Sequence, residues 1–189
     1  MPLPVLFPPP AAGVDQGTAS GEPSGGDAAV QYDGAMHATT LAPETPDQPE
    51  VIALIAELDA WQDTLYPPES RHALDLSSLM QARVRFHVAR DADGRAVGCG
   101  AVVLTPDHGE IKRMFVRPDC RGQGIARRLM QALEQAAAAA GCRVLRLETG
   151  PYQPEALGLY ASLGYRRRGP YGDYVDDPLS VFMEKSLAH

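Results

Sequence analysis

The sequence has only three cysteines and no long apolar run, and these two features exclude several classes of protein. Its three cysteines, an odd number without C-x-x-C spacing, make neither a disulfide framework nor a zinc site and indicate a reducing compartment. No stretch approaches the roughly 18 apolar residues of a membrane-spanning helix. The start, MPLPVLFPPPAAG, has no basic segment and is a poor secretory signal. We therefore expect a cytoplasmic protein with no membrane partner and no metal.

Basic residues are missing from the first part of the chain. No lysine or arginine precedes Arg71, and the first 70 residues carry eleven acidic ones. The whole chain has 17 basic and 24 acidic residues and a net charge of -7, which argues against a nucleic-acid partner. From residue 71 onward 17 basic residues face 13 acidic ones, so this part suits an anionic ligand.

Composition also divides the chain into a tail and one domain. Residues 1–33 combine proline, glycine, alanine and acidic residues with few large apolar ones, so they cannot bury enough surface to offset the entropy of ordering. We expect a disordered tail there. Residues 34–189 have the length of a single folded domain.

Apolar periodicity and turn residues predict the order of helices and strands in that domain. The order indicates an α+β fold, a mixed α/β sandwich, with one parallel crossover through its long helix. The expected elements are a weak strand at 36–42, an amphipathic helix at 49–66, a short helix capped by Ser70, two strands within 84–105 around an Asp93-Gly94 turn, a strand at 109–118, a long helix at 124–140, a strand at 143–150, a helix at 154–165 and two strands within 166–187.

The stretch RGQGIARRLMQALEQ, residues 121–135, places glycines between a predicted strand and the long helix. A helix that starts this way leaves its first N–H groups unpaired and directs a positive dipole end at its surroundings, which suits phosphate. Two common phosphate motifs do not fit. A dinucleotide fingerprint needs glycine where this chain has Arg127, and a Walker loop needs Gly-Lys-Ser/Thr.

The pattern Arg121-x-x-Gly124-x-Ala126 directly after a strand resembles the pyrophosphate-binding motif of the GNAT superfamily of acetyl-CoA-dependent N-acetyltransferases. The resemblance covers about residues 36–187 and extends to a bacterial small-molecule subgroup that includes YsnE-like proteins. It implies an acyltransferase with a central, mostly antiparallel twisted sheet of six to seven strands and about four helices. A splayed parallel strand pair would hold the co-substrate acetyl-CoA, and the resemblance also allows a homodimer.

The same resemblance implies which residues bind the co-substrate. Backbone groups of residues 114–116 would pair with the pantetheine arm, and one N–H there would polarise the thioester carbonyl. Amides of residues 121–126 would hold the pyrophosphate, and Arg127 or Arg128 would meet the remaining phosphate of CoA. The candidates are Met114, Phe115, Val116, Arg121, Gly122, Gln123, Gly124, Ile125, Ala126 and Arg127.

Two residues are candidates for catalysis. Tyr160 lies in LGLYASLGY, which matches the family segment whose phenol protonates the departing thiolate; the alternative is a core tyrosine. Glu110 lies six residues before Val116, hence on the same strand face, and a raised pKa would suit it as the base. A solvated glutamate with a water chain as base is the alternative. Many relatives have an asparagine where this chain reads PYQPEA, so whether Gln153 replaces it stays open.

By the same resemblance, the acceptor pocket forms from YPPESRHAL and PYGDYVDDPLS. The candidate residues there are Glu69, Arg71, His72, Tyr171 and Asp173. Arginine can clamp a carboxylate and acidic groups can receive an ammonium group, so we expect a small polar or amino-acid-like amine as acceptor. Two alternatives stay open: a protein or peptide N-acetyltransferase, and a non-catalytic regulatory module that binds acetyl-CoA.

Overall fold

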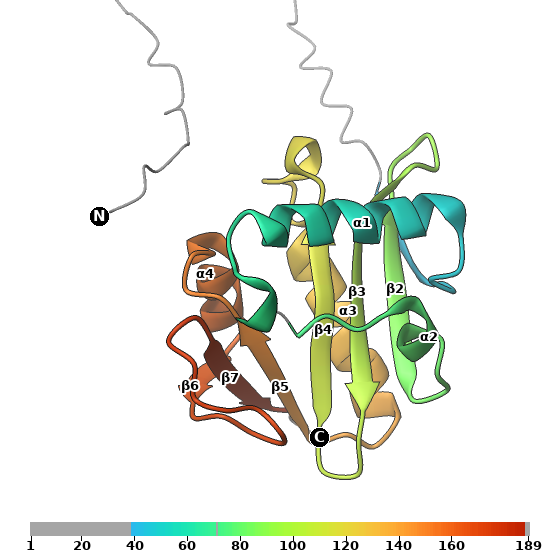
Figure 1. Ribbon diagram of the computed structural model, residues 1–189. Helices are drawn as coiled ribbons and strands as arrows, with labels where there is room; N and C mark the ends of the chain where they lie inside the picture. The colour runs from blue at the N-terminus through green and yellow to red at the C-terminus, as the bar shows by residue number, and fades with distance from the viewer. Residues whose placement is uncertain (1–38, 71, 188–189) are drawn as a thin grey trace, which may run out of the picture. The chain divides into compact units, whose positions relative to one another are not determined.

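The computed structural model describes residues 39–70 and 72–187, so the expected tail of residues 1–33 lies outside the described part. The described part forms one seven-stranded sheet in the order β1-β2-β3-β4-β5-β7-β6, with four α-helices (Figure 1). The elements are β1 (Thr40–Pro43), α1 (Pro49–Asp63), α2 (Leu76–Leu79), β2 (Val84–Arg90), β3 (Ala96–Leu104), β4 (Gly109–Val116), α3 (Ile125–Ala139), β5 (Val144–Thr149), α4 (Pro154–Ser162), β6 (Arg166–Arg168) and β7 (Val181–Ser186), with short 3-10 turns at Pro68–Ser70 and Pro118–Cys120.

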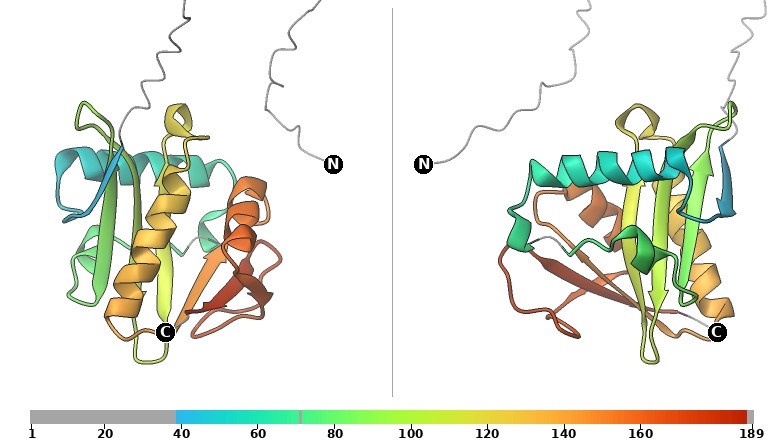
Figure 2. Two further views of the ribbon diagram at one scale, coloured as in Figure 1. Left: turned by 180° about the vertical axis from the view of Figure 1, so that it is seen from behind. Right: turned by 45° about the vertical axis from the view of Figure 1, so that its right-hand side comes forward.

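The helices cover the two faces of the sheet. Helix α1 crosses one face, and α3 runs along the opposite face with α4 beside it (Figure 1, Figure 2). On the α1 side, Leu54 is buried with Phe86 and Phe115. On the α3 side, Leu133 and Leu145 are fully buried. No helix in the described part is long and apolar enough to cross a membrane.

The expected elements are confirmed with two exceptions. The first strand was expected at residues 36–42, but β1 spans Thr40–Pro43, and residues 36–38 lie outside the described part. The parallel pair flanking the long helix is β4 and β5, and the Asp93-Gly94 turn has a positive φ of 80° at Gly94. The expectation that Ser70 caps the short helix is wrong, because Ser70 lies in a 3-10 turn. Helix α2 starts later and is capped by Asp75, whose Oδ1 accepts a hydrogen bond from the Ser78 N–H at 2.8 Å.

Strands β4 and β5 separate after a short paired stretch. Within the described residues they pair only over Gly109–Ile111 and Leu145–Leu147. Beyond Ile111, β4 contains a β-bulge, because Ala101 of β3 pairs with Lys112 while Cys99 pairs with Phe115. The backbone groups of β4 that point toward β5 therefore have no strand partner beyond that point.

The bulge also reverses which side chains face which side of the sheet. Beyond it, Val116 packs with Ile125 of α3 on one face, whereas Phe115 packs in the cluster under α1. Ahead of it, Ile111 faces α3 and its neighbour Glu110 faces the α1 side. The expectation that Glu110 and Val116 share a face is therefore wrong, since one extra residue in a strand shifts the two-residue alternation.

Arg113 sits at the bulge in an unusual conformation that its side chain holds in place. Its φ is 56°, a left-handed value that costs a non-glycine residue about 1–2 kcal/mol. The side chain is only 7% exposed, and its guanidinium pairs with Asp59 of α1 and donates through Nε to the Leu74 carbonyl at 3.0 Å. These contacts tie the bulge to α1 and to the segment before α2, and they offset the strain.

We expect Arg113→Gly to be more stable than Arg113→Ala by about 1 kcal/mol, because both variants lose the same contacts and only alanine keeps the left-handed strain. In an ordinary strand position the glycine variant would be the less stable of the two. A higher free energy of unfolding for the glycine variant therefore indicates a positive φ at residue 113. Urea unfolding of the two purified variants measures the difference. A more stable alanine variant would show that residue 113 does not hold a positive φ in solution.

Candidate active site

Two cavities meet where β4 and β5 separate. The larger is a cleft of about 420 Å³ lined by the end of β4, the loop at residues 120–124, the first turn of α3 and residues of α4. The smaller, of about 80 Å³, is lined by the end of α1, the end of β5, and Ser70, His72 and Ala73. Three residues line both cavities: Met114, Gln153 and Tyr160. A molecule in one cavity can therefore reach a molecule in the other at these side chains.

The larger cleft gathers most of the residues expected to bind the co-substrate. Nine of those ten candidates line it, and the exception, Gln123, is solvent-exposed. Gly122 and Gly124 have left-handed φ angles of 78° and 72°, which the loop needs in order to turn into α3. No described side chain caps the first N–H groups of α3, so they stay available to an anion.

The arginines near this loop are held by different partners. Arg121 donates through Nε to the Val116 carbonyl at 3.1 Å, and its guanidinium lies over the Trp61 ring at 5.3 Å. Arg127 lines the cleft and donates to Ser162 Oγ at 2.7 Å. Arg128 donates to the Thr39 carbonyl at 2.9 Å and does not line the cleft. Of the two arginines considered for the remaining phosphate, Arg127 is therefore the better placed.

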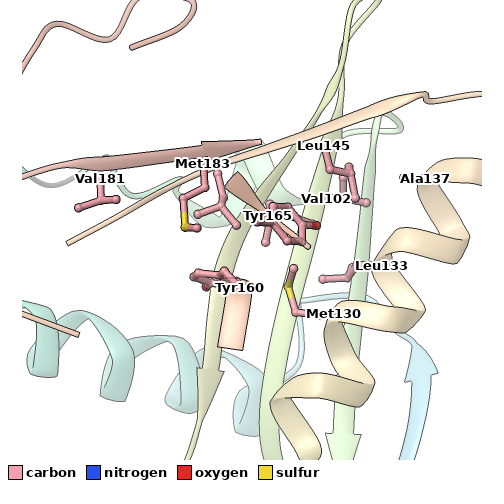
Figure 3. Packing of buried hydrophobic residues seen from close by; sticks show 11 residues of the cluster. Val102, Met130, Leu133, Ala137, Leu145, Tyr160, Tyr165, Val181 and Met183 are labelled. Carbon is pink, nitrogen blue, oxygen red and sulfur yellow. The ribbon is translucent and has the colours of Figure 1, made fainter. Parts of the chain in front are cut away.

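Tyr160 projects from α4 into a largely apolar environment at the junction. It is 7% exposed and lies near Tyr165, Met130 and Met183 (Figure 3). Burial, followed by the charge of Glu148, raises the pKa of its phenol to about 12. The phenol therefore stays protonated at neutral pH and is available as a proton donor.

Glu148 at the end of β5 is a site residue that the sequence reasoning missed. It lines the smaller cavity and accepts a hydrogen bond from Ser180 Oγ at 2.9 Å. Burial raises the pKa of its carboxyl, and the nearby Lys112 and His72 only partly counteract this effect. A glutamate near the end of a predicted strand, two residues before Gly150, was the available signal. The sequence did not reveal that the strand ends at a cavity.

Glu110 has a different environment and lines neither cavity. Its Oε1 accepts hydrogen bonds from the Tyr171 and Tyr174 hydroxyls at 2.9 Å and 2.7 Å, and it pairs with Lys112 at 3.0 Å. Burial raises its pKa, but the charge of Lys112 and the two phenols outweigh burial, so the pKa is lowered. The expectation of a raised pKa at Glu110 is therefore wrong.

The acceptor candidates are scattered in the structure. His72 lines the smaller cavity, and its ring packs edge-on against Tyr174 at 4.8 Å. Tyr171 lines neither cavity and binds Glu110, and Asp173 is exposed to solvent. Arg71 and the side chain of Glu69 lie outside the described part of the chain. Polar residues that line the smaller cavity and were not singled out are Gln62, Ser70, Lys112, Glu148 and Thr149.

Tyr66 fixes the chain segment that carries Gln153 to the junction. Its hydroxyl accepts a hydrogen bond from the Tyr152 N–H at 3.2 Å and also bonds with the Gln153 side chain. Gly150 permits this contact, because a Cβ there would lie 1.9 Å from the Tyr66 hydroxyl oxygen. Gln153 thus has a defined position at the junction, whether or not it replaces the asparagine of other sequences.

No group of three or more metal-ligating side chains occurs among residues 39–70 and 72–187. The polar groups at the two cavities include the Glu148 carboxyl, the buried phenol of Tyr160 and the backbone amides at the start of α3. Together they provide an anion-binding helix start, a carboxylate with a raised pKa and a protonated phenol around one junction. This combination suits the transfer of a group carried by a phosphate-bearing molecule to an acceptor that must lose a proton.

Comparison with known proteins agrees with this chemistry. The model of the "Acetyltransferase (GNAT) family" matches residues 52–165. The chain is 49% identical to an "IAA acetyltransferase" of Azospirillum brasilense over 80% of this chain and 100% of that protein. It is 38% identical to the uncharacterized N-acetyltransferase YsnE of Bacillus subtilis, over 73% of this chain and 93% of that protein. A solved Klebsiella pneumoniae structure, assigned as an acyl-CoA N-acyltransferase, has 42% identity and a TM-score of 0.68, covering 79% of this chain and 98% of that one. The expected GNAT fold is thereby confirmed.

We expect Glu110→Gln and Glu148→Gln to change stability with pH in opposite directions. The folded pKa of Glu110 is lowered, so its ionisation stabilises the fold above the ordinary pKa of 4.5, and this gain is lost as the pH falls. Glu110→Gln should lower the free energy of unfolding by about 2 kcal/mol at neutral pH, which is typical of hydrogen bonds to a charged group. The loss should be smaller in acid. The folded pKa of Glu148 is raised, so its ionisation opposes folding above pH 4.5. The stability of Glu148→Gln relative to wild type should therefore increase as the pH rises.

Urea unfolding of wild type and both variants, at neutral pH and below pH 4.5, measures these differences. Each glutamine keeps the shape of the side chain it replaces, so the two variants serve as controls for each other. Parallel pH dependences for the two variants would rule out the opposed environments.

Proposed function

The chain belongs to the GNAT acetyltransferase family, and we propose that it moves an acetyl group from acetyl-CoA to the amine of a small polar or amino-acid-like acceptor. The amine attacks directly while both molecules are bound. The observation that carries this proposal is the meeting of the two cavities at Met114, Gln153 and Tyr160. We call the larger cavity the donor cleft and the smaller one the acceptor pocket.

The donor cleft suits acetyl-CoA at both ends. The pyrophosphate would lie at the start of α3, where the glycine loop and the uncapped N–H groups provide donors. The pantetheine arm has two amide groups and would run along the edge of β4 that β5 leaves open, pairing as an added strand does. Arg127 is placed to meet a further phosphate. The thioester would then reach Met114 at the junction.

Glu148 is the proposed base. It lies in the acceptor pocket, and its pKa is raised toward neutral pH. A carboxylate with a higher pKa is a stronger base and accepts a proton more readily. It would take the proton that the amine loses, directly or through one water. Glu110, the alternative base, is less suited because its pKa is lowered and its Oε1 is occupied by two phenols and Lys112.

Tyr160 is the proposed acid. The amine nitrogen bonds to the acetyl carbon, the carbon–sulfur bond breaks, and the departing CoA thiolate takes the phenol proton. Burial keeps that proton on Tyr160 until the thiolate forms. A backbone N–H of β4 near Met114 would stabilise the oxyanion of the tetrahedral intermediate. Tyr160 then regains a proton from solvent, and Glu148 releases its proton to solvent.

The acceptor pocket supports a small polar amine. Its volume of about 80 Å³ leaves room for few atoms beside the reacting group. Ser70, His72 and Lys112 line the pocket together with Glu148, so it offers both hydrogen-bond donors and acceptors. Such a lining suits an amine that carries a second polar group, as an amino acid does.

We expect wild-type protein to release CoA from acetyl-CoA with at least one member of a panel of amino acids, polyamines, aromatic amines and short peptides. The panel also includes IAA, because the Azospirillum brasilense relative is named for it. A thiol reagent reads the release. Binding of acetyl-CoA by calorimetry with no release from any acceptor would contradict the proposal and favour a regulatory module, and release with peptides alone would favour a peptide acceptor.

With an accepted substrate, we expect Tyr160→Phe and Glu148→Gln each to lower kcat about 100-fold, the usual scale for loss of an acid or a base. Glu148→Gln should also lose the acidic limb of the pH profile, whose apparent pKa lies above 4.5 in wild type. Glu110→Gln is the matched control for the base and should retain that limb. A profile that loses its limb in Glu110→Gln and keeps it in Glu148→Gln would return the base role to Glu110.

A further inference from the structure

We infer that Trp61 is a further binding residue for acetyl-CoA, an inference that rests on the proposed function. Its indole would form the α1 wall of the donor cleft. It would also hold the Arg121 guanidinium against the end of β4, which keeps the loop at residues 121–124 in shape for the pyrophosphate. Trp61 lies within the amphipathic helix that the sequence predicts at 49–66.

The position of Trp61 is the first observation. It lies in the last turn of α1, is only partly buried, and lines the donor cleft together with Ala156 and Leu159 of α4. Among the cleft-lining residues it is the one contributed by α1. A large, rigid aromatic ring at a partly exposed cleft wall provides apolar surface against which a flexible arm such as pantetheine can pack.

The contact with Arg121 is the second observation. The guanidinium stands over the indole ring at 5.3 Å, within the range of a cation–π interaction. The same guanidinium donates through Nε to the Val116 carbonyl at 3.1 Å. Trp61 and Val116 therefore hold the side chain of the first residue of the phosphate motif. Its backbone stays in the loop, and its charge stays near the place proposed for the pyrophosphate.

The same end of α1 also serves the second cavity. Leu58, Gln62 and Tyr66 line the acceptor pocket, while Trp61 lies between them in sequence and lines the donor cleft. A loss of Trp61 that merely disturbed α1 would therefore affect the acceptor as much as the donor. Separate Michaelis constants for the two substrates distinguish a donor-binding role from a general loss of structure.

Intrinsic fluorescence provides a direct test, because Trp61 is the single tryptophan of the chain. We expect titration of wild-type protein with CoA to change the tryptophan emission, and the change to saturate with the dissociation constant measured by calorimetry. Saturation of binding with unaltered emission would overturn the inference. No CoA binding by wild type at all would instead overturn the proposed function, so the two failures are distinguishable.

Variants provide the second test. Trp61→Ala should weaken CoA binding about tenfold, since both the apolar wall and the cation–π contact are lost. Trp61→Phe keeps an aromatic ring and should weaken it less. In kinetics the KM for acetyl-CoA should rise with little change in the KM for the acceptor. The matched control is Ile52→Ala on the same helix, where the side chain is 41% exposed and outside both cavities.

A double-mutant cycle tests the link to Arg121. If Trp61 acts partly by holding Arg121, then Trp61→Ala combined with Arg121→Ala should weaken CoA binding by less than the product of the two single effects. Fully independent effects would overturn that link. Thermal unfolding of each variant identifies any that fails to fold, and Trp61→Phe then carries the test. Equal CoA affinities of wild type and a folded Trp61→Ala would overturn the inference as a whole.

Discussion

The separation of β4 from β5 after Ile111 is the constraint on which the rest of the site depends. It coincides with one extra residue in β4 at Arg113, whose left-handed backbone is held by Asp59 and the Leu74 carbonyl. The open edge of β4 begins beside this bulge. The two cavities meet at this opening, so the bulge lies next to the whole site.

The fold gives two glutamates on neighbouring strands opposite electrostatic environments. Glu110 sits beside Lys112 and two phenols, which hold its pKa below the ordinary value although it is buried. Glu148 has Ser180 as its hydrogen-bond partner, and burial dominates its pKa. One glutamate therefore fixes the loop before β7 through Tyr171 and Tyr174, while the other places a carboxyl with a raised pKa in the smaller cavity.

Helix and strand positions could be predicted because they depend on local patterns. The runs of β-type residues between turns in residues 84–116 and the apolar face of residues 125–137 locate β2, β3, β4 and α3, and a six-residue motif locates the phosphate loop. The α2 cap was placed at Ser70 instead of Asp75, since both residue types favour caps and only the fold decides where the helix begins. The face of Glu110 was misjudged because a non-glycine bulge at Arg113 leaves no local signal.

The sequence by itself determined the α+β fold class and the position of the phosphate loop, because both follow from short-range patterns of residue types. The resemblance of LGLYASLGY to a family segment is what indicated Tyr160. Only the tertiary structure decided which carboxylate lies at the junction, which arginine lines the cleft and that Trp61 faces the donor side. These features depend on the register of β4, the end of β5 and the packing of α1, which join residues far apart in the chain. Burial and neighbouring charge set the pKa of each group, and both exist only after folding.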